Sequence, residues 1–293
     1  MLQPLADFVK LMFKEEFIPT NANRLIFILS PVMAMAPAFL MMSVIPFGGV
    51  VTIGGETIKL VAADLGMGVL LVLGASSLTV YGLTMGGWSS GSKYSLMGAV
   101  RSTTQMISYE LSLGLAVVGV LLLNENFSLW EMAMEQSQGI WHWNIFKQPL
   151  GFLIFLIAIF AETNRLPFDL PEADSELVSG YHTEYSSMKF AFFFMGEYAA
   201  MTAGSAMMVV LFFGGWHFPG MSHLGLENWS LALAGVIVFV AKVFLLLLFF
   251  IQVRWTLPRF RFDQLMRLGW KVLLPLGLIN VLVTGLLVSL GIL

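Results

Sequence analysis

Residues 232–253 read ALAGVIVFVAKVFLLLLFFIQV, an apolar stretch with Lys242 as its single charged side chain. A helix that crosses a lipid bilayer needs ~20 mainly apolar residues, because each residue adds about 1.5 Å to its length. This stretch is long and apolar enough, so the sequence predicts a transmembrane helix here. Five further stretches have the same character, at residues 24–46, 62–85, 105–124, 190–214 and 272–292.

A seventh apolar stretch, residues 148–161, is short, with a helical length of roughly 21 Å. We expect it to cross the bilayer only by extending through Trp141–Lys147, with Trp141 and Trp143 at the membrane interface. The sequence therefore predicts an all-α integral membrane protein with about seven transmembrane helices. These helices would form a single polytopic membrane domain over residues 1–293.

The composition excludes several classes of protein. Of all residues, 58% are hydrophobic and 11% are charged, against roughly 25% charged in an average soluble domain, so lipid must cover much of the chain. Because the chain has no cysteine, disulfides, thiolate-bound zinc and cysteine-ligated iron–sulfur clusters are excluded within it. The histidines lie outside the long apolar stretches, so paired haem ligands are missing as well. We expect this chain to bind no cofactor or metal, and a partner to carry any electrons.

Residues 1–20 predict an amphipathic helix. Apolar side chains recur every three or four positions, at Leu2, Leu5, Phe8, Val9, Met12 and Phe13. Asp7, Lys10 and Lys14 lie between them, a pattern typical of a helix that lies on a membrane surface. The alternative is a cytosolic helix packed against a partner protein. The scattered charges exclude a cleavable signal peptide.

The lysines and arginines predict the orientation of the chain. One side of the predicted spans holds Lys10, Lys14, Arg24, Lys93, Arg101, Arg165, Lys189, Arg254, Arg259, Arg261, Arg267 and Lys271. The other side holds Lys59 and Lys147, and the side richer in lysine and arginine is the cytoplasmic one. We therefore expect the amphipathic helix and the loops 162–189 and 254–271 to face the cytoplasm.

The loop 162–189 is rich in carboxylates. Its acidic residues are Glu162, Asp169, Glu172, Asp174, Glu176 and Glu184, opposite Arg165 and Lys189. Two prolines restrict the backbone, and the apolar residues between the acids favour a loop that protein covers. Arg165 among these carboxylates predicts an ion-pair network at a functional site. The alternative is a solvated loop without such a role.

Ionisable side chains also occur inside the predicted spans, at Glu110, Glu197 and Lys242. A charge at that depth costs about 3 kcal/mol unless it is paired or hydrated, so each is a candidate functional residue. The adjoining Tyr109 and Tyr198 supply hydrogen-bond partners, which favours a proton relay. A structural Glu–Lys pair between packed helices is the alternative.

The loop 254–271 alternates basic residues with aromatic ones. This pattern suits lipid head groups or an acidic protein partner, although anchoring at the cytoplasmic face also explains it. We expect no nucleic-acid partner, because the segment is held at a membrane surface.

Together these stretches resemble the quinone-site membrane subunit of respiratory complex I, the proton-pumping NADH:quinone oxidoreductase, a family that comprises mitochondrial subunit 1 and its bacterial counterparts. The motifs that carry the resemblance run in order along the chain: Gln3-Pro4-Leu5-Ala6-Asp7 with Lys10, Gln105 with Ser108-Tyr109-Glu110, Glu162-Thr163-Asn164-Arg165 with Pro167–Glu172, Glu176-Leu177 with Gly180, Gly196-Glu197-Tyr198, and Arg254–Trp270. Asp174 stands where the family usually has a glutamate. The family also begins with a further transmembrane helix and a basic loop, which we expect this chain to lack.

The resemblance implies a membrane protein that has no redox centre of its own and forms most of the chamber in which the substrate, a quinone, is reduced. Iron–sulfur clusters and flavin would lie in hydrophilic partner subunits of the peripheral arm, and antiporter-like membrane subunits would be further partners. The multi-pass chain would lie in the bacterial inner membrane. The implied site residues are an acidic funnel at the quinone site (Glu162, Asp169, Glu172, Asp174, Glu176 and Glu184, with Arg165), a proton relay (Glu110, Glu197 and Lys242) and a surface-helix motif (Gln3, Asp7 and Lys10).

Two alternatives stay open. The first is the homologous subunit of a sister complex driven by ferredoxin, a reduced deazaflavin or hydrogen, although Thr163-Asn164-Arg165 favours the quinone-linked branch. The second is a stand-alone proton or ion transporter, which would need a site between broken helices near the bilayer midplane. The sequence shows no paired Gly/Pro breaks there. A passive membrane anchor would not explain the acids inside the spans.

Overall fold

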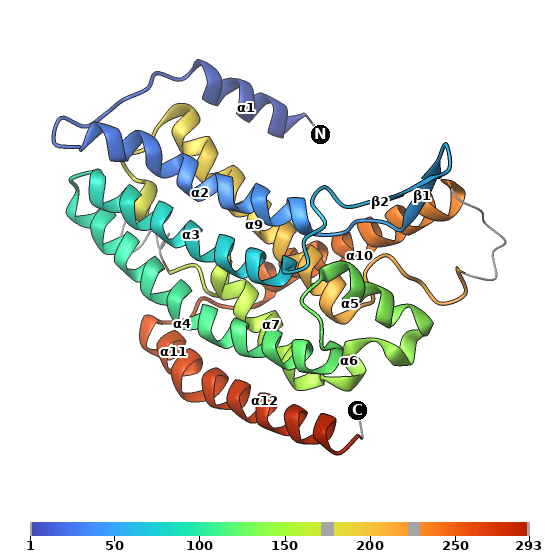
Figure 1. The fold of residues 1–293 in the computed structure, drawn as a ribbon. Coiled ribbons are helices and arrows are strands. Elements are labelled where there is room, and N and C mark those ends of the chain that lie inside the picture. The colour runs from blue at the N-terminus through green and yellow to red at the C-terminus, as the bar shows by residue number, and fades with distance from the viewer. Residues whose placement is uncertain (1, 171–178, 222–228, 292–293) are drawn as a thin grey trace.

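The computed structural model describes residues 2–170, 179–221 and 229–291, and this part of the chain is almost entirely helical (Figure 1). Six helices are long and apolar enough to cross a membrane: α2 (Arg24–Val44), α3 (Gly68–Ser89), α4 (Lys93–Asn124), α9 (Ser187–Phe212), α10 (Trp229–Thr256) and the C-terminal run Phe262–Ser289. That last run consists of α11 (Phe262–Leu268), one π-helical turn (Gly269–Leu273) and α12 (Leu274–Ser289). The predicted all-α integral membrane fold is confirmed.

The seventh apolar stretch forms the short helix α7 (Pro149–Glu162), and its predicted extension through Trp141–Lys147 is wrong. Gln148 leaves helical geometry at φ −132° and ψ 63°, so that the residues before it form only a 3-10 turn (Ile140–His142) and the single-turn helix α6 (Asn144–Lys147). Helix α7 packs against α4, α9 and α12, and its side chains Ile154, Phe155 and Ala158 are fully buried. Protein therefore covers most of this short helix, and Leu153 stays exposed.

Helix α4 begins at Lys93, twelve residues before the apolar stretch from which it was predicted. Its first turns are rich in serine and threonine, which hydropathy alone assigns to a loop. In the fold these side chains are satisfied by other elements: Ser95 Oγ donates to the Tyr181 carbonyl at 2.9 Å, and Thr103 pairs with Thr84 of α3. Tertiary contacts therefore permit polar residues inside this helix.

The helices alternate in direction, so that their ends gather at two opposite ends of the molecule (Figure 1). One end holds the start of α2, the turn between α3 and α4, and the end of α7, with exposed Trp88, Tyr94 and Trp255 nearby. The other end carries exposed Trp141 and Trp229. Exposed tryptophan and tyrosine at both ends are typical of the two membrane–water interfaces.

The second end also carries the only sheet of the described residues, an antiparallel hairpin of β1 (Val50–Ile53) and β2 (Glu56–Lys59). Three short helical segments close this end: α5 (Leu129–Glu135), a 3-10 turn (Gln136–Gln138) and the α6 region. Another 3-10 turn, Gly180–His182, precedes α9 at the first end.

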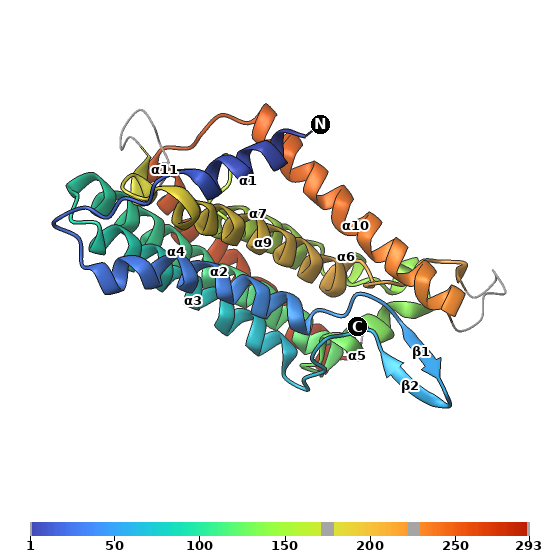
Figure 2. The same ribbon diagram turned by 90° about the horizontal axis from the view of Figure 1, so that it is seen from above.

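Helix α1 (Gln3–Phe13) confirms the helix predicted for the N-terminal segment. It lies outside the bundle on the side of α9, while α10 crosses α9 obliquely (Figure 2). Ser187 Oγ donates to the Leu11 carbonyl at 3.0 Å, and Lys189 forms an ion pair with Glu16 at 3.2 Å. These contacts tie α1 to the start of α9, and the apolar side chains of α1, such as Phe13, stay exposed.

The most extensive helix contact is between α2 and α3, where Gly82 lies against the backbone of α2. Ser30 Oγ donates to the Gly82 carbonyl at 2.6 Å, and a Cβ built on Gly82 would lie 2.5 Å from the Ala34 nitrogen. Backbone atoms cannot rotate away as a side chain can, so these two helices fit together only with glycine at this position.

Gly82→Ala should therefore push α2 and α3 apart and destabilise the protein by about 1–3 kcal/mol, the usual cost of overpacking. The measurement is the thermal unfolding midpoint of the detergent-purified protein. Gly74→Ala is the matched control, because it lies on the same helix with nothing within 4 Å of its added Cβ. Equal midpoints for the two variants would contradict this packing.

Candidate functional site

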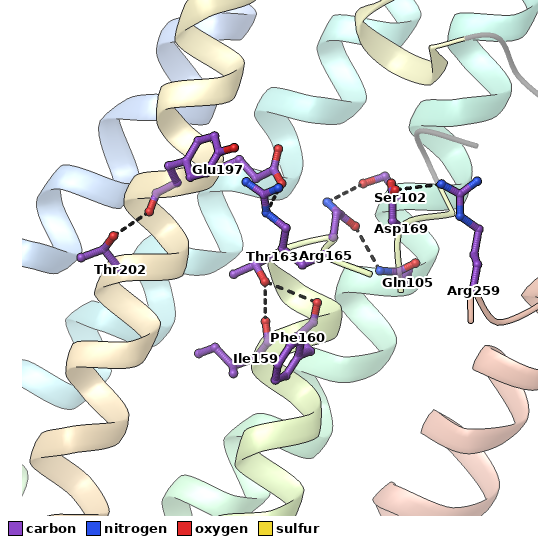
Figure 3. A network of polar contacts seen from close by, with 12 residues as sticks. Ser102, Gln105, Ile159, Phe160, Thr163, Arg165, Asp169, Glu197, Thr202 and Arg259 are labelled. Carbon is purple, nitrogen blue, oxygen red and sulfur yellow. Dashed lines mark hydrogen bonds and ion pairs between the residues drawn. The ribbon is translucent and has the colours of Figure 1, made fainter. Parts of the chain in front are cut away.

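The segment that follows α7, residues 163–170, folds back onto the buried side chain of Gln105 in α4. Gln105 Nε2 donates to the Ala161 carbonyl at 2.8 Å, to Asn164 Oδ1 at 3.1 Å and to the Phe168 carbonyl at 2.8 Å. Asn164 has a left-handed backbone with φ 49° and donates in turn to Ser102 Oγ at 3.2 Å (Figure 3). Two motifs that are far apart in the sequence thus form one polar network.

Arg165 leaves this segment and reaches the membrane carboxylate Glu197 on α9 (Figure 3). The Nε atom of Arg165 lies 2.8 Å from Oε1 of Glu197, and only about a tenth of each side chain is exposed. The guanidinium also lies 4.3 Å from the ring of Tyr198. An ion pair of Arg165 therefore exists among the described residues, and Glu197, the partner in it, comes from a transmembrane helix.

Asp169 joins the same segment to the basic loop that follows α10. Its Oδ2 lies 2.9 Å from Nη2 of Arg259, the Phe260 nitrogen donates to the Pro167 carbonyl at 3.1 Å, and the Phe168 and Phe260 rings lie 5.4 Å apart. Burial raises the pKa of Asp169, and the nearby Arg259 acts in the opposite direction. The two cytoplasm-facing loops of the sequence prediction are thus in direct contact.

Glu162 ends α7 and lies between two small cavities of about 30 Å³ each. The first is lined by Glu162 together with Ser76 of α3, and the second by Glu162 together with Glu197. One residue further along α3, the Ser77 hydroxyl donates to Glu110 Oε1. Glu110, Glu162 and Glu197 therefore lie in a row across α4, α7 and α9, with the serines of α3 beside it.

A larger groove of about 520 Å³ lies between α1 and the start of α9. One wall carries the charged side chains of Asp7, Lys10 and Lys14, and the other carries Phe190 and Phe194. Gln3 of the same motif donates from Nε2 to Asp7 Oδ1 at 3.3 Å. The surface-helix motif thus forms the polar side of a groove whose opposite side is aromatic.

The remaining predicted site residues lie elsewhere. Glu172, Asp174 and Glu176 lie outside the described residues. Glu184 lies just before α9, and it is half-buried. The sequence did not single out Arg259 or Ser77 as site residues. A serine or a loop arginine gives no signal until its distant partner is known, here Glu110 for Ser77 and Asp169 for Arg259.

Lys242 is not brought together with the three carboxylates. Its Nζ donates to the carbonyls of Phe213, Gly215 and His217 at 2.7, 2.9 and 2.7 Å, and it lies 4.7 Å from the Trp143 ring. These carbonyls follow the C-terminal end of α9, roughly 24 Å along the helix from Glu197. Lys242 thus neutralises the negative end of this helix, and its predicted place in a proton relay stays a prediction.

Comparisons with known proteins show the family of this chain. Residues 1–285 match the sequence model of a family described as NADH dehydrogenase. An NADH-quinone oxidoreductase subunit of Geobacter metallireducens is 50% identical over 99% of this chain and 83% of its own length. The equivalent NADH-quinone oxidoreductase subunits of Flavobacterium johnsoniae (48% identical, over 97% of this chain and 81% of the relative) and Koribacter versatilis (50% identical, over 99% and 85%) are similar to the same extent.

Burial beside Lys242 gives His217 a testable pH dependence. Burial, with a smaller contribution from the Lys242 ammonium, lowers the pKa of His217 to about 4 from its ordinary 6.5. The unfolded chain then binds more protons than the folded one between these values, so the protein should lose stability as the pH falls from 6.5 to 4. His217→Gln should reduce this loss, as measured by thermal unfolding across that range.

The control for this measurement is His142→Gln, which changes an exposed histidine at the same end of the molecule. It should leave the pH dependence of the unfolding midpoint as in the wild type. If the His217 variant followed the wild-type curve as well, the buried and neutral state of His217 would be refuted.

Proposed function

Because this chain belongs to the NADH dehydrogenase family, we propose that it is the quinone-binding membrane subunit of an NADH:quinone oxidoreductase. In this role it forms the quinone chamber and couples quinone reduction to proton translocation. The observation that carries the proposal is the ion pair between Arg165 and Glu197. It joins the loop assigned to the quinone site to a carboxylate inside the membrane bundle.

The groove between α1 and α9 supports the chamber. Its volume of about 520 Å³ falls within the range of ordinary small-molecule pockets, about 300–1,000 Å³. An aromatic wall suits an apolar quinone tail, and the charged wall formed by Asp7, Lys10 and Lys14 suits a polar head group. On this proposal α1 lies on the membrane surface, and the quinone enters from lipid alongside α9.

The row of carboxylates supports the coupling. Reduction of a quinone requires protons, and on this proposal Asp169 and Glu162 belong to the acidic loop that supplies them. Interactions between charges are strong where water is scarce. Protonation of one carboxylate therefore changes how readily its neighbours bind a proton. Arg165 would carry this change to Glu197, and Glu162 would pass it to Glu110 through the serines of α3.

Membership of the family also implies partners and a location. The chain is a multi-pass membrane protein, and its relatives are subunits of a multi-subunit bacterial enzyme. We propose that hydrophilic iron–sulfur and flavin subunits dock over the loops 162–189 and 254–271 on the cytoplasmic face. Antiporter-like membrane subunits would receive the response from Glu110, and Lys242 would extend the relay beyond the three carboxylates.

Glu197→Gln tests this proposal in the complete complex isolated from native membranes. The substitution keeps the size of the side chain but removes the charge that Arg165 neutralises. The rate of quinone reduction, or the rate of proton translocation coupled to it, should fall by roughly tenfold, which corresponds to about 1.4 kcal/mol. Glu131→Gln, an exposed carboxylate on α5, is the control and should behave as the wild type.

Assembly of each variant is checked by the yield of the complex and its subunit content. A fully assembled Glu197 variant with wild-type quinone reduction and wild-type proton translocation would refute the assignment of Glu197.

A further inference from the structure

The cavity lined by Glu162 and Glu197 is also lined by a threonine to which the proposed function gives no role. Thr79 of α3 lines this cavity. Its hydroxyl oxygen is shielded from solvent and has no hydrogen-bond partner among the residues that the structure describes. A buried hydroxyl without a hydrogen-bond partner destabilises a protein by about 1–3 kcal/mol, so we expect a ligand that can bind to it.

We propose that this cavity binds one water molecule, which Thr79 holds between the carboxylates of Glu162 and Glu197. The inference rests on the proposed function and deepens it, because it assigns a bound-water site and a positioning residue to the gap between two relay carboxylates.

The size of the cavity suits one water molecule and little else. Its volume of about 30 Å³ exceeds the ~10–15 Å³ that a single water requires. The rest of the lining is largely apolar, with Ala34, Leu83 and Phe193 among the contributors. A larger polar ligand would therefore find neither the space nor enough partners.

The donors and acceptors around the cavity are also complementary to water. A buried water typically makes two to four hydrogen bonds, and the cavity offers the Thr79 hydroxyl and two carboxyl groups. Thr163 also lines it, and because its hydroxyl already donates to the Ile159 carbonyl at 2.9 Å, it can only accept. A carboxylate has about four lone-pair positions, so the ion pair with Arg165 leaves Glu197 able to accept from water.

The bound water would join the two acids chemically. It receives a proton from the protonated carboxyl group on one side and donates one of its own protons to the carboxylate on the other. The water is regenerated, and one proton has moved between Glu162 and Glu197. Thr79 does not exchange the proton itself; it fixes the position and orientation of the water.

Thr79→Val tests the inference because valine keeps the shape of threonine and removes only the hydroxyl. In the complete complex, the rate of proton translocation should fall about three- to tenfold, the effect of losing one buried hydrogen bond. Thr79→Ser keeps the hydroxyl and should restore the wild-type rate. Leu78→Val introduces the same branched side chain at the neighbouring, exposed position of α3 and should leave the rate unchanged.

A density map of the complex at a resolution that shows ordered water provides the second measurement. We expect a peak within hydrogen-bond distance of the Thr79 oxygen in the wild type and no such peak in the valine variant. An empty cavity in the wild type, or a Thr79→Val complex with the wild-type rate of proton translocation, would overturn the inference.

These outcomes are separable from those of the proposed function. If Glu197→Gln impairs the complex while Thr79→Val does not, the water site fails and the proposed function stands. If Glu197→Gln has no effect, the proposed function fails, and the density map alone decides whether the cavity binds water.

Discussion

A carboxylate inside a bundle of apolar helices needs a partner, and for Glu197 that partner is Arg165. Leaving either charge alone would cost several kcal/mol, because neither lipid nor apolar side chains can replace water. The pair at 2.8 Å therefore requires the segment after α7 to fold down onto α9. Gln105 supports the same arrangement, since its amide donates to the end of α7 at Ala161 and to two acceptors of that segment, Asn164 and Phe168. Contacts from inside the membrane bundle thus hold residues 163–170 of the proposed quinone-site loop in place.

This constraint explains how a surface loop and buried acids can act together. The segment is held on one side by Glu197 and on the other by Arg259, which pairs with Asp169 at 2.9 Å. Arg165 and Asp169 are only a few residues apart in the chain. A change of charge at Glu197 or at Asp169 would therefore affect both ion pairs. Helix α1 completes the arrangement, as its tie to the start of α9 places the groove beside the same loop. Fold and proposed function therefore depend on the same few polar contacts.

Much of this fold could be predicted from the sequence, because the length of an apolar stretch largely determines whether a helix can cross a bilayer. The errors occur where packing overrides hydropathy. Gln148 interrupts the expected extension of α7, and the serines and threonines at the start of α4 are helical because other elements satisfy them. For the site, the sequence identified Arg165 and Glu197 but not their pairing. Contacts such as Asp169 with Arg259, or Ser77 with Glu110, join residues far apart in the chain and leave no trace in local sequence patterns.

The central claim is that this chain provides the quinone site of an NADH-driven enzyme. Its most direct test is to purify the chain with its partners from mildly solubilised native membranes, identify the partners and measure quinone reduction. The account predicts that iron–sulfur and flavin subunits co-purify and that NADH drives quinone reduction by the isolated complex. Quinone reduction driven only by ferredoxin, a deazaflavin or hydrogen, or a purified chain without any iron–sulfur partner, would contradict it.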